Sequence, residues 1–349
     1  MRRKKQTAPD WPAVAAALAA RIPHAALHPA AMLRAQAEYV KEKRKTGRPS
    51  RWALAFSGGA DSLALLLLFW AEGPTRWGRD FVVLHFNHRL RGRAADRDER
   101  FCRNVCASLG VSFVAGRWDK APPAASEAAA RAARQAFFKR EMNRRKLRLL
   151  WLAHQQDDIA ETLLMRLARG SGPAGLAAPR PVHALADGRI HLRPLLTLKK
   201  AELVAALKAA GADWCEDESN GAADFLRNRM RQRVLPAWKK AAGRDALAGA
   251  SLARQLMEED DDALESWVDR LYVLKRGTLD VKGLNGLPKA VVRRALHRWL
   301  LAVRPDTDLS RKGFERLLAA VEQGEATRFS LGRAHFAVIR QGALTLRRA

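Results

Sequence analysis

The sequence predicts an α/β fold built on a doubly wound parallel sheet, with a smaller, mostly helical region towards the carboxyl end. From Trp52 onwards, short apolar runs alternate with segments of helical periodicity, which is typical of successive βαβ units. The first of these runs passes directly into a glycine-rich turn and then into a helix. At 349 residues the chain is also too long for one core of ordinary size, so we expect a second domain.

Four short apolar runs are the predicted strands of the sheet, over 52–56, 81–86, 111–115 and 149–153. Apolar residues at helical spacing predict helices near 61–71, 95–109, 126–146 and 157–168. Ligands of such sheets bind beyond the carboxyl ends of the strands. Residues that directly follow each apolar run are therefore the first candidates for a site.

We divide the chain into three parts. Residues 1–50 form a basic, alanine-rich amino-terminal extension, 51–220 form the catalytic domain, and 221–349 form a helical linker with a small substrate-binding domain. Polar and apolar residues alternate over 326–347 around two glycines, which indicates strands in this last part.

The charge of the chain predicts a polyanionic partner. It has 63 Lys and Arg against 36 Asp and Glu, a formal net charge of +27. Arginine use in a high-GC genome is the alternative explanation. However, basic residues recur over 140–148, 227–233 and 293–298, so several elements share the excess, as expected of a surface that binds phosphate backbones.

Membrane insertion and export are both disfavoured. No apolar run approaches the roughly 20 residues that span a bilayer. The amino-terminal MRRKK resembles the start of a signal peptide, but Asp10, Trp11 and Pro12 interrupt the pattern. Three cysteines form no disulfide framework, and we interpret Cys102 and Cys106, one helical turn apart, as buried residues rather than a metal pair. We expect a cytoplasmic protein.

A predicted phosphate-binding loop follows the first strand. It consists of Ser57, Gly58, Gly59, Ala60, Asp61 and Ser62. Its glycines let backbone N–H groups approach an anion, the hydroxyls add donors, and the following helix points its positive end at the same place. A carboxylate beside polyphosphate makes most sense with a bridging Mg²⁺, so Asp61 is the candidate metal ligand. A simple strand-to-helix turn is the alternative.

The loop has neither the Walker A ending nor the dinucleotide GxGxxG pattern. Its sequence SGGADS instead resembles the PP-loop of N-type ATP pyrophosphatases, which cleave ATP to AMP and pyrophosphate while they activate a substrate oxygen. The resemblance implies that residues 57–62 bind ATP with Mg²⁺ as cofactor.

Two further segments resemble lysidine synthases of this superfamily. His85-Phe86-Asn87-His88-Arg89-Leu90-Arg91 is similar to their HxNHxLR segment, and we expect His85 to contact ATP rather than a metal. A helix similar to their E..AR..RYxFF segment brings Arg131 and Arg134 onto one face, where forked donors would clamp phosphate or the nucleotide intermediate. Gln135 replaces the usual tyrosine. A solvated arginine stripe is the alternative.

The segment after the fourth strand, AHQQDDIAET over 153–162, resembles the AHHxDDxxET of lysidine synthases. Asp158 and Glu161 are three apart on one helical face, so they predict a two-carboxylate pocket suited to the ammonium groups of free lysine. Helix capping is the alternative use of such acids. His154 is a candidate ATP contact, and Gln155 stands where a second histidine is usual.

The resemblance extends over about 50–240 through segments similar to RGSGxxGL, RPLL, DxSN and RNxxR, at 169–176, 193–196, 217–220 and 227–231. It implies that ATP adenylates C2 of the wobble cytidine of a tRNA(Ile) with anticodon CAU, and that free L-lysine then displaces AMP. Asp61, Asp158, Glu161 and Arg131 are the implied catalytic residues. The small domain would bind tRNA, a homodimer is possible, and we expect the further carboxyl-terminal domain of longer members to be lacking.

Two other functions are weighed against this one. A tRNA 2-thiolation enzyme would share the ATP loop and the basic surface, but such enzymes usually carry CxxC motifs and this sequence has none. A non-catalytic RNA-binding protein on a degenerate nucleotide fold would have lost the carboxylates, yet Asp61, Asp158 and Glu161 are present.

Overall fold

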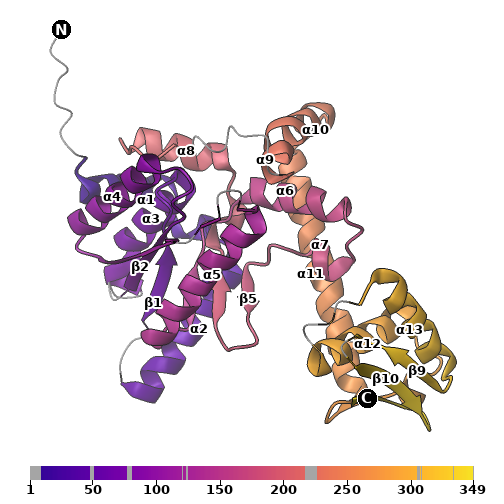
Figure 1. Cartoon of the computed structure of the whole chain (residues 1–349). Coiled ribbons are helices and arrows are strands. Elements are labelled where there is room, and N and C mark those ends of the chain that lie inside the picture. The colour runs from indigo at the N-terminus through magenta and orange to yellow at the C-terminus, as the bar shows by residue number, and fades with distance from the viewer. Residues whose placement is uncertain are drawn as a thin grey trace. The chain divides into compact units, whose positions relative to one another are not determined.

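The computed structural model describes residues 9–47, 51–76, 81–119, 121–122, 125–216, 226–304, 307, 309–332 and 334–348. Its contacts divide the chain into two compact units, residues 1–255 and residues 256–349 (Figure 1). No helix within the described ranges combines the length and the apolarity needed to cross a bilayer.

The first unit contains a six-stranded sheet in the order β3-β2-β1-β4-β6-β5. Its strands are β1 (Trp52–Ala55), β2 (Phe81–Asn87), β3 (Ser112–Arg117), β4 (Leu149–Trp151), β5 (Val182–Ala184) and β6 (Ile190–Leu192). All pairs are parallel except β5 with β6. This confirms the predicted doubly wound sheet. The strand order reverses between β1 and β4, and such a reversal is where ligands bind in this class of fold.

The helical segments of this unit connect the strands and extend beyond them. They are α1 (Trp11–Arg21), η1 (His24–Ala26), α2 (Pro29–Thr46), α3 (Ala60–Arg76), α4 (Arg93–Ser108), α5 (Glu127–Arg144), α6 (Gln156–Leu167), α7 (Pro173–Leu176), η2 (Pro194–Thr197), α8 (Lys200–Ala209), α9 (Leu226–Arg229), the π-helical η4 (Met230–Val234) and α10 (Leu235–Ala241). A further helix, α11 (Ala246–Leu271), begins in this unit and continues into the second.

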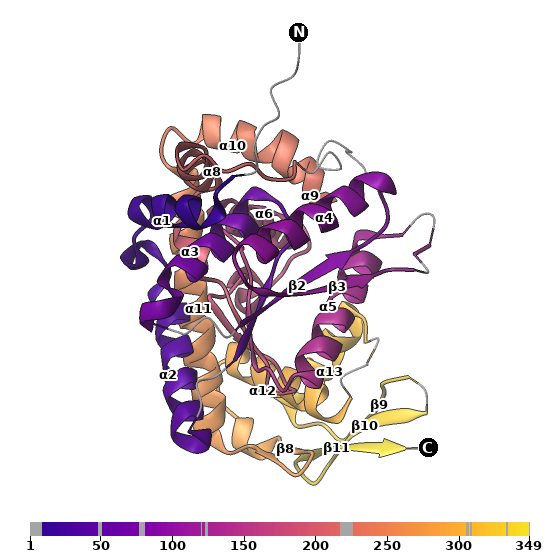
Figure 2. The ribbon, with the colours of Figure 1, turned by 90° about the vertical axis from the view of Figure 1, so that its left-hand side faces the viewer.

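Side chains that alternate along the strands build a core on each face of the sheet. On one face, Leu54 and Val83 pack in a cluster to which α1, α2, α3, α4 and α8 contribute. On the other face, Val82 and Leu84 pack with Phe137 of α5. Figure 2 shows α4 and α5 on opposite sides of β2 and β3. Both faces are covered, which explains why the strands read as continuous apolar runs.

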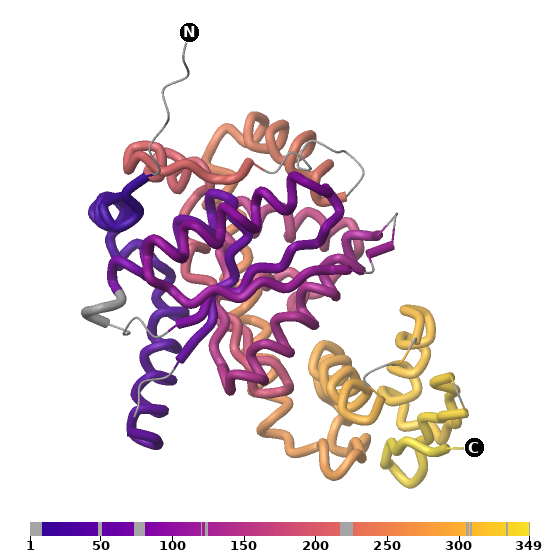
Figure 3. Tube along the Cα trace, turned by 60° about the vertical axis from the view of Figure 1, so that its left-hand side comes forward, coloured from indigo at the N-terminus to yellow at the C-terminus, as the bar shows by residue number. Residues whose placement is uncertain are grey.

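Helices α1 and α2 belong to the core of the first unit, although the sequence suggested a separate basic extension over 1–50. Trp11, Leu18 and Met32 are buried in the same cluster as the sheet. Along the trace in Figure 3, α1 lies beside α8, and contacts join the two helices. The alanine-rich composition leaves these helices with an apolar face that the core can accept.

The second unit has its own antiparallel sheet in the order β7-β8-β11-β10-β9. Its elements are β7 (Leu274–Lys275), β8 (Thr278–Asp280), η5 (Lys282–Leu284), α12 (Lys289–Val303), α13 (Arg311–Gln323), β9 (Thr327–Ser330), β10 (His335–Arg340) and β11 (Ala343–Arg348). Trp299 and Leu317 of its helices pack with Ile339 and Leu344 of the sheet. The strands predicted over 326–347 are confirmed, and the contacts place the division of the chain at 255, inside α11.

Candidate active site

The loop over Ser57–Ser62 lies at the carboxyl end of β1, where the strand order reverses. Hydrogen bonds of its two serines stabilise the conformation of the loop. Ser62 Oγ accepts a hydrogen bond from Ser57 N at 3.2 Å and donates to Gly59 O at 3.0 Å, and the two hydroxyl oxygens lie 3.0 Å apart. Ala60 begins α3, so the amino end of that helix faces the loop. This is the predicted arrangement of a phosphate-binding loop.

Gly58 adopts a backbone conformation that only glycine takes readily, with φ at +94°. A Cβ atom there would lie 3.1 Å from Cys102 Sγ and 3.2 Å from Cys215 Sγ. The carbonyl of Gly58 also accepts a hydrogen bond from Cys215 N at 3.0 Å. The loop therefore packs against two thiols from distant parts of the chain, and there is no space for a side chain at position 58.

Asp61, in the first turn of α3, has an unusual carboxyl group. Burial raises its pKa from 3.8 to about 6, against the opposing effect of Lys200. Its Oδ1 atom is buried and has no hydrogen-bond partner among the described residues. An unpartnered buried carboxylate oxygen suits a cation, because a buried charge is costly unless it is paired.

The residues around Asp61 fit Mg²⁺ in a particular way. In the part of the chain that the structure describes, no group of three or more His, Cys, Asp or Glu side chains could hold a metal ion. An ion bound at Asp61 would therefore take most of its ligands from phosphate and water. Mg²⁺ binds in this manner, since it keeps several waters and needs only one or two carboxylates.

His85 lies against the residue that precedes the loop. It is buried, and its Nδ1 lies 2.9 Å from the carbonyl oxygen of Phe56, the residue before the loop. Burial lowers its pKa, and so does the charge of Arg103, whereas the charges of Glu99 and Asp98 raise it. A neutral imidazole in this position can hold the end of β1 in place.

The start of α6 is fixed by a reciprocal cap. Gln155 is fully buried, and its Oε1 accepts a hydrogen bond from Asp157 N at 2.5 Å. In return, Asp158 Oδ2 accepts one from Gln155 N at 3.0 Å. Position 155, where the resemblance leads us to expect histidine, is thus the residue that caps the helix.

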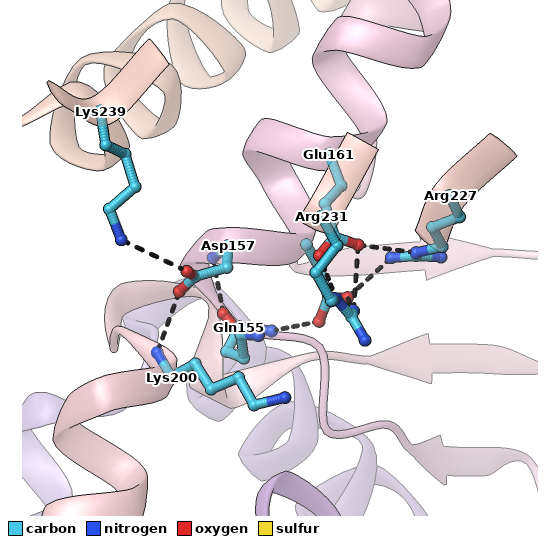
Figure 4. A network of polar contacts seen from close by, with 8 residues as sticks. Gln155, Asp157, Glu161, Lys200, Arg227, Arg231 and Lys239 are labelled. Carbon is cyan, nitrogen blue, oxygen red and sulfur yellow. Dashed lines mark hydrogen bonds and ion pairs between the residues drawn. The ribbon is translucent and has the colours of Figure 1, made fainter. Parts of the chain in front are cut away.

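Asp158 and Glu161 lie together, as predicted, but both carboxylates bind arginine side chains. Figure 4 shows Arg227 and Arg231 at Glu161. Arg227 donates to Asp158 Oδ1 at 2.6 Å and to Glu161 Oε2 at 2.8 Å. Arg231 donates to Glu161 Oε1 at 2.6 Å and to its Oε2 at 3.1 Å. Glu161 is fully buried. The two-carboxylate pocket is therefore a network of two acids and two arginines.

His154 lies among arginines from several elements. Arg193, directly after β6, donates to His154 Nδ1 at 3.2 Å. Burial holds the pKa of His154 well below its usual range, and the charges of Arg193, Arg227, Arg134 and Arg131 lower it further. Burial also lowers the pKa of Arg134 to about 10, and its Nε has no partner among the described residues. Arg134 is thus half-buried in a positive group around His154, whereas Arg131 is exposed to solvent and adds its charge from there.

Besides Arg227 and Arg231, the basic residues Arg193 and Lys200 lie at the site and were not among the predicted site residues. Arg193 and Lys200 follow β6, and Lys200 is the charged side chain with the largest effect on the pKa of Asp61. The strand-end rule would have found Arg193, but β6 is only three residues long and has no clear sequence pattern. The segment over 217–220, similar to DxSN, lies outside the described residues.

The reversed strand order, the glycine loop after β1 and the carboxylates of α6, after the neighbouring strand β4, define a PP-loop protein. The family model described as the PP-loop domain matches residues 32–238. Among proteins named tRNA(Ile)-lysidine synthase, one from Geobacter sulfurreducens is 36% identical over 284 residues, which cover 76% of this chain and 58% of that protein. Another, from Chlorobaculum tepidum, is 34% identical over 235 residues, which cover 66% of this chain and 69% of that protein.

The chain therefore belongs to the tRNA(Ile)-lysidine synthase family of PP-loop proteins. A member from Aromatoleum aromaticum is 42% identical over 195 residues, 55% of this chain and 44% of that protein. The chain matches less than two thirds of the length of the Geobacter and Aromatoleum proteins.

Proposed function

We propose that this protein is a cytoplasmic enzyme that uses ATP and free L-lysine to convert the wobble cytidine of a tRNA(Ile) with anticodon CAU to lysidine. The observation that carries the proposal is the grouping of the loop around Asp61 with Asp158 and Glu161 at the ends of the neighbouring strands β1 and β4. The net charge of +27 and the names of the relatives support a tRNA substrate.

The first half of the reaction adenylates the base. The loop over 57–62 would bind the ATP phosphates, and Asp61 would hold Mg²⁺, which would supply positive charge beside the leaving pyrophosphate. The C2 oxygen of cytosine attacks the α-phosphate, and the bond from the α-phosphate to the pyrophosphate oxygen breaks. Arg131, Arg134 and Arg193 are suited to hold the RNA phosphate or the adenylated base, because their charges converge on His154. The cytosine must leave the stack of the anticodon loop to reach them.

In the second half, the side-chain amine of lysine attacks C2 and AMP leaves with the oxygen. Asp158 and Glu161 are the proposed ammonium acceptors. A carboxylate offers about four lone-pair positions. Among the described residues, Asp158 accepts two hydrogen bonds and Glu161 accepts three, so capacity remains for an ammonium group beside the arginines. Because a free lysine amine has a pKa of about 10.4, the pocket must also help it to lose a proton.

Incorporation of radiolabelled lysine into total tRNA by the purified protein, with ATP and Mg²⁺, tests this proposal. We expect label in the intact protein and none in Asp61→Ala or Glu161→Ala. If pyrophosphate is released only when tRNA is added but lysine is not incorporated, the protein adenylates RNA and lysine is the wrong nucleophile. If tRNA binds and neither signal appears, a non-catalytic RNA-binding function replaces the proposal.

A further inference from the structure

A cavity of about 370 Å³ opens at the start of α6. Its lining includes Asp157, Glu161, Lys200, Arg231 and Lys239, so acids and bases from four helical elements meet there. Leu235 and Pro236 complete one wall. Glu161, one of the proposed ammonium acceptors, is among the lining residues of the cavity.

Most of the basic groups around this cavity have a carboxylate partner. Arg231 binds Glu161, and Lys239 Nζ lies 3.8 Å from Asp157 Oδ1. Lys199, the residue before α8, pairs with Asp245 at 2.5 Å. These cations offset acids of the protein itself.

Lys200 differs from its neighbours. Its backbone N–H donates to Asp157 Oδ2 at 3.0 Å, which fixes the first residue of α8. Its ammonium group, by contrast, makes no hydrogen bond or ion pair with any residue that the structure describes, and Figure 4 shows the side chain extended away from Asp157. Lys200 thus has a fixed backbone and an ammonium group at a cavity without a counter-charge among the described residues. Such a group is suited to bind an anionic ligand.

The charge of Lys200 acts on Asp61 of the phosphate-binding loop, which indicates the kind of anion that Lys200 binds. Among the charged groups that affect the pKa of Asp61, Lys200 has the largest effect, and it lowers that pKa. The loop over 57–62 contains no basic residue, so the positive charge that a Walker A loop carries must come from another segment here. Resting on the proposed function, we infer that Lys200 binds the phosphates of ATP and stabilises the pyrophosphate that leaves.

The chemistry requires no proton transfer at Lys200. As the bond between the α-phosphorus and the bridging oxygen breaks, the electron pair stays on that oxygen. The ammonium group stabilises the negative charge that develops on this oxygen in the transition state. An arginine would keep the charge, whereas a methionine would keep only the length of the side chain.

Calorimetric binding of Mg·ATP, and separately of inorganic pyrophosphate, tests the inference without requiring turnover. We expect Lys200→Met to weaken both affinities by about ten- to hundredfold, as for the loss of a charge-assisted hydrogen bond. Lys200→Arg should recover much of the loss. Lys208→Met, an exposed lysine near the other end of α8, is the matched control and should bind like the unmodified protein.

Unchanged Mg·ATP and pyrophosphate affinities in Lys200→Met would overturn the inference. So would an increase in the KM for lysine without a change in nucleotide affinity, because Lys200 would then serve the carboxylate of the amino acid. Circular dichroism and the Tm of each variant separate misfolding from lost binding, and Lys200→Arg tests the charge if the methionine variant does not fold. The binding result stands even if no lysine enters tRNA, so the two proposals fail independently.

Discussion

Asp61 makes the stability of the protein depend on pH. Its pKa in the folded chain, about 6, is higher than the ordinary 3.8, so the folded state binds the proton more tightly than the unfolded state. Stability is therefore greatest when the carboxyl is protonated and falls as the pH rises from about 4 to about 6. The full loss amounts to about 3 kcal/mol.

We predict that Asp61→Asn stabilises the protein at pH 7 and abolishes use of ATP, because the amide removes the buried charge and the metal ligand together. The free energy of unfolding in urea, without Mg²⁺ or nucleotide, should exceed that of the unmodified protein at pH 7 but not at pH 4. Asp213→Asn, at an exposed carboxyl, should show no such trend. A difference that is equal at both pH values would contradict the burial of an ionisable Asp61.

The two glycines of the loop should respond differently to alanine. Gly58→Ala forces a side chain into a φ of +94° and against two sulfur atoms, so we expect a loss of stability of at least about 1 to 2 kcal/mol, together with lost ATP binding. In Gly59→Ala the nearest atom to the new Cβ is Ser57 Oγ at 3.7 Å, and the change in stability should stay within about 0.5 kcal/mol. Urea unfolding of the pair provides the measurement, and equal losses would contradict the loop geometry.

At the scale of elements, Arg227 and Arg231 attach the helical segment of α9 and η4 to α6. Removing the acid between them leaves two partly buried guanidinium groups without their main counter-charge. We predict that Glu161→Gln lowers the free energy of unfolding by about 3 kcal/mol and accelerates amide hydrogen exchange over 226–234. A double variant with Arg231→Met should lose less than the sum of the single variants. Additive losses would mean that the two side chains do not interact.

The sheet and the position of the loop could be predicted from the sequence because strands buried on both faces are continuous apolar runs. Strands β1 to β4 and helices α3 to α6 all lie where the pattern placed them. The pairing of Asp158 and Glu161 with Arg227 and Arg231 could not be predicted. These acids are 66 to 70 residues from their partners, and helical spacing says nothing about contacts over such separations.

At the scale of the whole molecule, the excess of positive charge predicts a strong dependence of tRNA binding on salt. If 6 to 10 phosphates are contacted, the affinity should fall by roughly 10³ to 10⁵ between 50 and 200 mM salt. Filter binding across this range gives the slope, and the binding of Mg·ATP provides the comparison, since it involves one small ligand. An affinity for tRNA that does not change with salt would contradict a phosphate-binding surface.

The division of the molecule into two units was harder to predict than the fold of the first unit. Helix α11 contributes Leu247 to a core cluster of the first unit and Val268 to the core of the second. A continuous helix gives no turn or composition change at the division, so the sequence suggested a boundary near 220 instead. The alanine-rich start of the chain was likewise set apart because its helices have few large apolar side chains.

The cap of α6 has a consequence for how this protein can change over evolutionary time. Position 155 needs a side chain that accepts a hydrogen bond at a helix start and fits a fully buried site, and glutamine meets both requirements. Asp158 accepts one hydrogen bond from the backbone of Gln155, which caps the helix, and another from the side chain of Arg227. A substitution at 158 would therefore break two interactions at once. Sequence drift at this helix start should therefore be tolerated at 155 and rejected at 158, even among variants that still bind ATP.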